Sequence, residues 1–211
     1  ADHGGSVYFD VVGDWITATG IDLSSERTIE FWYYKSTNST ALETIFSIGN
    51  GYTDNVGVSL FTRNGDFEFR VGTSIVYDSG LSLDLFDFTW HHIAIVISSS
   101  NSADLYINGS RKYSGSNVTR SNSMPISIGS SVNGLTWNNT IEMQGFISDF
   151  AIFNSAKYSG TTLTIPTSPL SSSGAELHIK GTDASIIDKS QINNLKIHGN
   201  TTGSTTQVKF A

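Results

Sequence analysis

The chain has 211 residues, a formal net charge of −7 and only 15% charged residues. This balance argues against nucleic-acid binding, because phosphate neutralisation requires clustered Lys and Arg and the sequence has no such cluster. No apolar run approaches the roughly 20 residues that cross a membrane as a helix, so we expect no membrane insertion. The absence of cysteine excludes disulfides and thiol chemistry. Since neither a signal peptide nor an initial Met is present, we expect a processed segment.

Short strands separated by turns are predicted along most of the chain. They combine β-branched and aromatic residues with alternation of apolar and polar positions. In chain order these strands cover residues 6–10, 15–19, 28–34, 41–48, 56–62, 66–71, 75–77, 91–98, 104–108, 111–113, 125–129 and 142–153. Asn64-Gly65 and Asn108-Gly109 favour tight hairpin turns. About a dozen short strands without an amphipathic helix indicate an all-β, two-sheet antiparallel sandwich.

Two neighbouring strands are predicted to form the centre of one sheet. Residues 91–98 are almost continuously apolar, which indicates a strand buried on both faces. The next strand places Leu105 and Ile107 on one side and Tyr106 on the other, because successive side chains point to opposite faces. We expect the remaining strands to cover this antiparallel pair.

The predicted strand over residues 142–153 is the longest of the late strands. Regular alternation marks Phe146, Phe150 and Ile152 as one buried face and places Phe153 on the other.

The pattern changes after residue 160, where a Pro- and Ser-rich hinge begins. Further strands are predicted over residues 175–180, 194–198 and 207–210, with a turn region at 183–189 and a polar stretch at 200–206. We expect a sandwich over residues 1–170, a hinge over 171–174, and C-terminal strands over 175–211. These strands either complete the same sandwich or are donated to the next subunit.

Six stretches, in this order, carry a resemblance to a known family: GSVYFDVVGDWI (5–16), TIEFWYY (28–34), TWHHIAIV (89–96), LYINGS (105–110), ISIGSS (126–131) and GFISDFAIFNSAKYSG (145–160). They resemble the concanavalin A-like lectin/glucanase superfamily, specifically its laminin G-like jelly-roll branch. The resemblance implies a jelly-roll sandwich and little about activity. Within the family, the chain is similar to domains in virion appendage proteins of marine bacteriophages, which implies a virion or cell-surface location. Val11-Val12 depart from the family, which usually carries Gly in that turn.

The C-terminal residues 176–210 resemble the segment that stands at the start of such domains, just before the first of these stretches. Read as a circle, Phe210-Ala211 runs into Ala1-Asp2, so the chain looks like one repeat period cut between its second and third strands. In one interpretation the segment closes its own sandwich as a circularly permuted domain. In the other it pairs with the next subunit and builds a head-to-tail array.

The candidate metal ligands are Asp10, Asp14 and Asp149. Relatives with this fold often hold one Ca²⁺ near a sheet edge, so the resemblance implies a Ca²⁺ bound by carboxylates and backbone carbonyls, about six to eight oxygens in all. Alternatively, Asp10 and Asp14 form a side-chain-to-backbone turn and Asp149 caps a strand edge. Asp183 and Asp188 form a second, weaker candidate pair on a loop.

The candidate carbohydrate-binding residues lie in the loop LTWNNT and just before it. Trp137 offers an apolar ring for stacking on a sugar, and Asn133, Asn138 and Asn139 offer planar amides for hydrogen bonds. The alternative is that this Trp folds over the sheet or is buried against a neighbour.

His91-His92 is not predicted to be a metal motif, because adjacent strand residues point to opposite faces and cannot share one ion. We expect both histidines to pack or hydrogen-bond inside the fold, and we expect Trp32 and Trp90, which lie within strands, to belong to the core.

Catalysis is not expected. Glucanases of this fold carry paired carboxylates followed by a third, and glycoside hydrolysis requires an acid and a base or nucleophile about 5–9.5 Å apart. Only Asp66-x-Glu68 and Asp84-x-x-Asp87 approach that spacing, and no third carboxylate follows either pair.

The sequence therefore favours a non-catalytic structural, assembly or adhesion module at an extracellular or virion surface. Its partners would be copies of itself or a surface glycan. The alternative is a carbohydrate-binding module that recognises host-surface polysaccharide, and a glycan-active enzyme is the remote third hypothesis.

Overall fold

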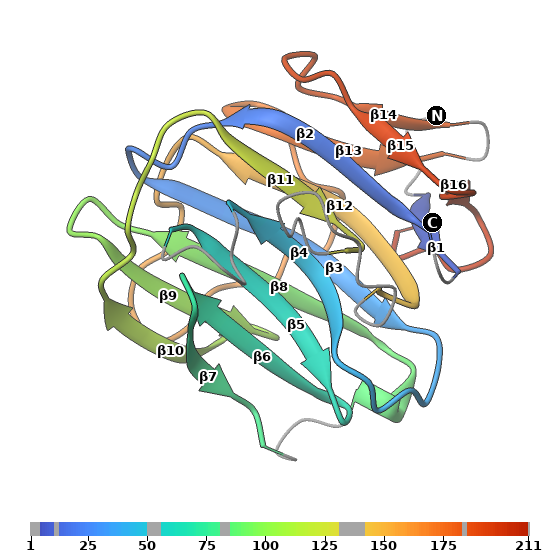
Figure 1. Cartoon of the computed structure of the whole chain (residues 1–211), viewed down its shortest axis with the longest axis horizontal. Helices are drawn as coiled ribbons and strands as arrows, with labels where there is room; N and C mark the ends of the chain where they lie inside the picture. The colour runs from blue at the N-terminus through green and yellow to red at the C-terminus, as the bar shows by residue number, and fades with distance from the viewer. Residues whose placement is uncertain are drawn as a thin grey trace.

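The computed structural model describes residues 5–10, 13–49, 56–80, 85–130, 142–182 and 185–210. Two antiparallel sheets pack face to face and enclose a large apolar core (Figure 1). Among these residues the helical structure is limited to one 3₁₀ turn, η1 (Leu85–Asp87). The predicted all-β sandwich of two antiparallel sheets is confirmed. The same residues hold no helix long and apolar enough to cross a membrane.

The larger sheet has nine strands in the order β10-β9-β8-β3-β12-β1-β16, with β13 and β14 attached beside β12. Their bounds are β1 (Ser6–Phe9), β3 (Arg27–Lys35), β8 (Trp90–Ile97), β9 (Ser102–Ile107), β10 (Ser110–Ser116), β12 (Gly145–Phe153), β13 (Ala175–Gly181), β14 (Ile186–Asp188) and β16 (Thr202–Ser204). β12 is central: it pairs with β3 along one edge, whereas β1 and β13 share its other edge, one after the other.

The smaller sheet has seven strands in the order β15-β2-β11-β4-β5-β6-β7. Their bounds are β2 (Trp15–Ile21), β4 (Glu43–Ile48), β5 (Val58–Arg63), β6 (Asp66–Val71), β7 (Ser74–Asp78), β11 (Met124–Ile128) and β15 (Lys196–His198). Both sheets thus contain strands from the start and the end of the chain, which ties the C-terminal segment to the rest of the fold.

The core lies between the inner faces of the two sheets. Phe31 of β3 and Phe150 of β12 stack with ring centroids 5.1 Å apart, and Phe46 of β4 meets both rings from the opposite sheet at 5.7 and 5.5 Å. Such aromatic contacts add about 0.5–1.5 kcal/mol per pair beyond the burial of apolar area. These rings hold the two sheets together at the centre of the sandwich.

The central strand β8 is buried on both faces, as predicted. Its residues Ile93, Ile95 and Ile97 belong to the core between the sheets. On the outer face Ala94 and Val96 pack with Tyr106 of β9, under Ala156, Tyr158 and Leu163 from the segment that follows β12. The Asn108-Gly109 turn between β9 and β10 has positive φ at both residues, 48° and 81°, as a type I′ hairpin requires.

The predicted buried face of β12 is wrong in one position. The core residues are Ile147, Phe150 and Ile152, whereas Phe146 points to the outer face, where it stacks on Tyr8 at 4.5 Å. The cause is a bulge between Ser148 and Ala151, at which Asp149 adopts φ 54°. A bulge inserts one extra residue and therefore reverses the alternation on one side of it.

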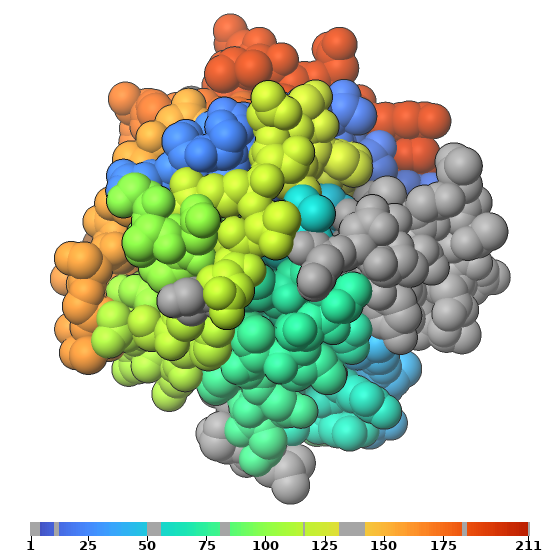
Figure 2. Space-filling view, turned by 60° about the vertical axis from the view of Figure 1, so that its left-hand side comes forward, coloured from blue at the N-terminus to red at the C-terminus, as the bar shows by residue number. Residues whose placement is uncertain are grey.

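The C-terminal segment pairs with strands of the same chain, where β13 lies beside β12, β15 beside β2 and β16 beside β1. It occupies one end of the molecule, next to β2 (Figure 2). The predicted strand over 207–210 is wrong, because these residues cross the outer face at Trp32 instead, with Lys209 over its ring and Phe210 at its edge. The terminal strand is β16, inside the stretch predicted as polar connection.

Candidate functional site

The loop between β1 and β2 meets the turn after β15 at one rim of the sandwich. Asp14 is 1% exposed, and its carboxylate accepts hydrogen bonds from the backbone N–H of Asp10 (3.1 Å) and of Asn200 (2.8 Å). The side-chain amide of Asn200 donates to the Asp10 carboxylate at 2.8 Å. Asp10 and Asp14 therefore form the side-chain-to-backbone turn that was the alternative to metal binding, and a residue 186 positions away completes it.

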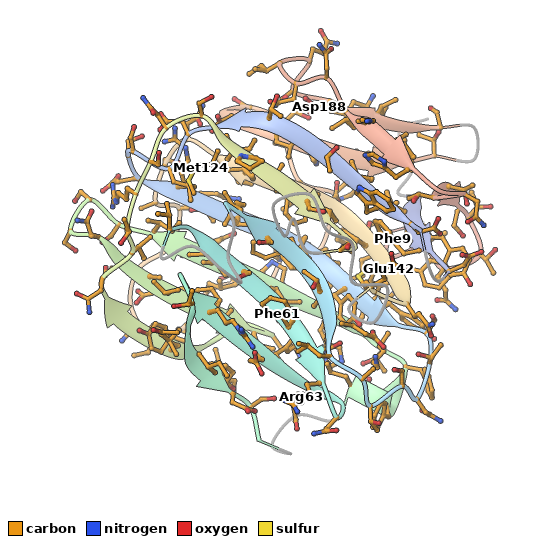
Figure 3. All side chains as sticks on the ribbon, viewed as in Figure 1. Phe9, Phe61, Arg63, Met124, Glu142 and Asp188 are labelled. Atoms are coloured by element: carbon orange, nitrogen blue, oxygen red, sulfur yellow. The ribbon has the colours of Figure 1, made fainter. Side chains whose placement is uncertain are left out.

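A third carboxylate, that of Glu142, reaches the same loop. Its Oε2 accepts the Gly13 N–H at 2.8 Å, whereas its buried Oε1 has no hydrogen-bond partner among the described residues. Glu142 lies just before β12 and forms an isolated β-bridge with Thr44. It lies near Phe9, at the end of β1 (Figure 3). We call Asp10, Asp14, Glu142 and Asn200 the rim cluster. Sequence reasoning missed Glu142, because its contact with Gly13 spans 129 positions and no local sequence pattern indicates it.

The rim cluster is acidic. Burial raises the pKa of Asp14 above its ordinary 3.8, and the neighbouring Asp10 carboxylate adds to the rise, although the Asp10 and Asn200 N–H groups oppose it. Burial also raises the pKa of Glu142 from 4.5, and the charge of Asp14 raises it further. Among the described residues no Lys, Arg or His forms an ion pair with these carboxylates. The cluster therefore stabilises a proton, or another cation, more than a surface carboxylate does.

Asp149 makes a different set of contacts. Its carboxylate accepts from the imidazole of His178 (3.0 Å), the ammonium of Lys180 (3.2 Å) and the N–H of Leu170 (3.1 Å). Burial alone would raise its pKa, but the His178 hydrogen bond and the Lys180 charge outweigh burial and hold the pKa below 3.8. We call these four residues the Asp149 latch, since they join the β12 bulge to the hinge and to β13.

Together with Ser172, the latch has the residue types of a catalytic triad without its arrangement. Ser172 Oγ lies 2.8 Å from Nδ1 of His178, and Asp149 bonds Nε2. In the usual hydrolytic triad the serine meets Nε2 and the carboxylate meets Nδ1. Lys180 also shares the Asp149 oxygen that bonds the fully buried imidazole. We therefore assign these contacts a structural role.

The two adjacent histidines separate onto opposite faces of β8, as predicted. His91 faces inward, where Nδ1 accepts from the Asn108 amide at 3.0 Å. His92 faces outward and bonds Glu30 at 3.0 Å. Glu30 is fully buried and also accepts from Lys157 and Tyr158. Burial would raise the pKa of Glu30, yet the His92 and Lys157 contacts outweigh it and hold the pKa below 4.5.

The other candidate site residues divide into three groups. Asp188 accepts hydrogen bonds from Ser190 and Asn193 and thereby shapes its own loop, whereas its partner Asp183 lies outside the described residues. Trp32 is buried at 4%, as predicted, under Lys209 and Phe210 on the outer face, whereas Trp90 is only half-buried, so its predicted place in the core is wrong. The proposed sugar-binding residues all fall in 131–141, outside the described part of the chain: Trp137, Asn133, Asn138 and Asn139.

Three or more His, Asp or Glu side chains that could together hold a metal ion do not occur in the described residues. Asp149 in particular is occupied by the latch, whereas Asp10 and Asp14 belong to the rim cluster. The structure thus brings together two of the three candidate metal ligands and adds Glu142 and Asn200 to them.

The family model of the concanavalin A-like lectin/glucanases superfamily matches residues 10–159. The chain belongs to this superfamily. No curated protein matches the sequence at a significant level. The matched range ends before the hinge, so the C-terminal strands β13 to β16 lie outside it.

A heptameric SAP-like pentraxin from Limulus polyphemus aligns at TM-score 0.59 and 13% identity, over 93% of this chain and 95% of that one. A candidate carbohydrate binding protein from Bacteroides ovatus aligns at TM-score 0.60 and 15% identity, over 96% and 62%. Domains LG4-5 of the mouse laminin α1 chain align at TM-score 0.52 and 15% identity, over 78% and 48%. At these identities the likeness concerns the fold alone.

Proposed function

We propose that this chain is a non-catalytic adhesion module at an extracellular or virion surface, which binds a surface glycan at the rim of its sandwich. The rim cluster carries the proposal, because it gathers three carboxylates from two distant parts of the sequence and leaves one buried oxygen without a partner in the described part of the chain. The similarity in fold to a pentraxin, to laminin domains and to a candidate carbohydrate binding protein supports it.

The rim cluster has the residue types that bind calcium, although its side chains are not at present arranged around an ion. The neighbouring Asp10 carboxylate raises the pKa of Asp14, and the charge of Asp14 raises that of Glu142, so negative charge accumulates in this cluster. Ca²⁺ prefers carboxylate oxygens and uses about six to eight ligands. In our proposal Asp10, Asp14 and the Oε1 atom of Glu142 would converge on the ion, whose charge would offset the repulsion among the three carboxylates.

An aromatic ring suitable for sugar stacking lies next to this cluster. Trp15 follows Asp14 directly, is half-buried, and stacks on His198 with ring centroids 4.1 Å apart. Trp137, Asn133, Asn138 and Asn139 precede Glu142 closely in the sequence, so the proposed sugar-binding residues stay part of the hypothesis. A ring beside carboxylates, amides and a cation offers both the apolar and the polar contacts that saccharides require.

The described carboxylates support a non-catalytic role. Glu68 pairs with Arg70 on β6, and Asp66 accepts a hydrogen bond from Ser79. Asp66 and Glu68 are two residues apart on β6 and therefore lie on the same face of the sheet, but each carboxylate is already bound to its own partner. Neither is therefore available as the acid or the base of a glycosidase.

The test is calcium binding by isothermal titration on metal-free protein, followed by a glycan array with and without a chelator. We expect Glu142→Gln and Asp14→Asn to weaken calcium binding at least tenfold. Asp149→Asn is the matched control, because this buried carboxylate belongs to the latch, and it should leave calcium binding unchanged. Trp137→Ala should abolish glycan binding. Glycan binding that survives both the chelator and the rim variants would remove the rim from consideration.

Self-association is a second candidate function, and the C-terminal segment favours it. Residues 175–210 supply four strands after a hinge, and the same pairings with β12, β2 and β1 can form between copies, as in strand exchange. Light scattering at low and high concentration, with and without a chelator, tests this. A concentration-dependent ladder of masses supports an assembly role, whereas a constant mass of one chain rejects it.

A further inference from the structure

Four aromatic side chains cross the outer face of the nine-stranded sheet in one line. Tyr8, Phe146, Tyr34 and Trp90 are direct register neighbours on β1, β12, β3 and β8. Successive ring centroids lie 4.5, 5.8 and 5.5 Å apart. Since neighbouring strands are spaced by about 4.8 Å, this aromatic row extends for about 14 Å.

Other described parts of that face are covered by the chain itself. Residues 156–163 pack over β8 and β9, and Leu170 packs over Phe153. The C-terminal residues Lys209 and Phe210 cover Trp32, which is 4% exposed.

These covering residues do not extend over the aromatic row. Tyr8, Tyr34 and Trp90 remain half-buried, with Phe146 at 8% exposure between them. The uncovered part of the face is therefore aromatic in all four neighbouring strands.

A positive charge stands beside the aromatic row. The Lys209 ammonium lies 3.8 Å from the centroid of Trp32, which precedes Tyr34 by two residues on the same face of β3. Burial lowers the pKa of Lys209, and no carboxylate among the described residues forms an ion pair with it. In a chain with net charge −7, a poorly hydrated ammonium without a partner favours an anionic ligand.

We propose that the aromatic row binds an acidic oligosaccharide, whose sugar rings stack on Tyr8, Tyr34 and Trp90 and whose carboxylate or sulfate pairs with Lys209. Aromatic rings with a polar tip combine apolar area with hydrogen-bonding groups, which suits the two kinds of surface on a sugar. The length of the row fits an oligosaccharide rather than a single sugar. Lys209 selects an acidic ligand over a neutral one. The site shares no residue with the rim cluster and needs no calcium.

The experiment is a fluorescence and calorimetric titration in the presence of a chelator. The probes are a galacturonic acid oligomer, a sulfated heparin oligosaccharide and a neutral dextran oligomer. We expect an acidic probe to bind at least tenfold more tightly than dextran, and the better of the two acidic probes distinguishes carboxylate from sulfate. Trp90→Ala and Tyr34→Ala should each weaken that binding at least tenfold. Tyr77→Ala, a half-buried aromatic residue on β7 of the other sheet, is the control and should bind as the wild type does.

Lys209→Gln separates charge from stacking, because it should reduce the preference for the acidic probe and its salt dependence without abolishing stacking. If the Ala variants unfold, Trp90→Phe and Lys209→Glu carry the test, since the first retains a ring and the second reverses the charge of a half-buried side chain. Absence of binding to both acidic probes, or wild-type affinity in folded Trp90 and Lys209 variants, overturns the proposal. Loss of binding only in the rim variants would instead assign the glycan to the rim.

Discussion

Replacing Asp149 should break the contacts that the latch makes at the β12 bulge. The Asp149 side chain is 3% exposed and accepts hydrogen bonds from His178, Lys180 and the Leu170 N–H. Removing one partner of a buried ion pair costs about 3–5 kcal/mol, because the other charge stays buried. An Ala at φ 54° adds about 1–2 kcal/mol of backbone strain. We therefore expect Asp149→Ala to lower the free energy of unfolding by roughly 4–6 kcal/mol.

Two companion variants separate the cost of the broken ion pair from the cost of the backbone strain. Asp149→Asn tolerates the positive φ and keeps one acceptor, so we expect a loss of roughly 2–3 kcal/mol. Asp149→Gly should be at least as stable as Asp149→Ala, because relief of about 1–2 kcal/mol of strain exceeds the entropy cost of about 0.5–1 kcal/mol for Gly. At a regular strand position the order of Gly and Ala would be reversed.

The assay is urea unfolding followed by tryptophan fluorescence, over a range of pH. Because the pKa of Asp149 is held below 3.8, its stabilisation is fully present above that pH and is lost as the pH falls through the lower, folded value. The difference between wild type and Asp149→Asn should therefore be constant near neutral pH and shrink in acid. A loss below about 1 kcal/mol for Asp149→Ala, or a Gly variant clearly less stable than the Ala variant, would refute the reasoning.

Three further predictions use the same measurement. Phe150→Ala should cost about 3–5 kcal/mol, whereas Phe146→Ala, on the outer face, should cost less than about 2 kcal/mol; equal losses would contradict the bulge. Glu142→Gln should gain stability relative to wild type as the pH rises above 4.5, because the raised pKa of Glu142 makes the wild type lose stability as the pH rises through it; a parallel pH profile would argue against this. Gly57→Ala should cost more than about 2 kcal/mol, because φ is 88° and the added Cβ meets the Ile48 carbonyl oxygen; a neutral effect would mean that this turn can shift.

The sequence predicted most strands because their patterns are local. Asp66–Val71 (β6) alternates along its whole length, and the apolar run at β8 indicated burial on both faces before any partner was known. The Asn108-Gly109 turn was recognisable because few residues adopt positive φ at two successive positions. Strand 207–210 was predicted wrongly, since a short apolar–polar alternation also suits a segment that lies across a sheet face.

The candidate site was predicted in part. Asp10 and Asp14 are close in sequence, so a shared turn could be anticipated from them alone. Glu142 and Asn200 reach the rim cluster through contacts of 129 and 186 positions, which no local pattern encodes. The aromatic row has the same origin, because each of its residues lies on a different strand and only the register aligns them.

By itself the sequence determined an all-β sandwich without cysteine, the turn chemistry of its hairpins and the buried character of its central strand, because each follows from composition or from a period of two. Tertiary structure alone decided which way β12 faces on each side of Asp149, where the C-terminal strands pair, and which carboxylates share the rim. The physical reason is that a bulge, a register and a long-range hydrogen bond are chosen by competition among whole packing arrangements, in which one inserted residue reverses every side chain beyond it.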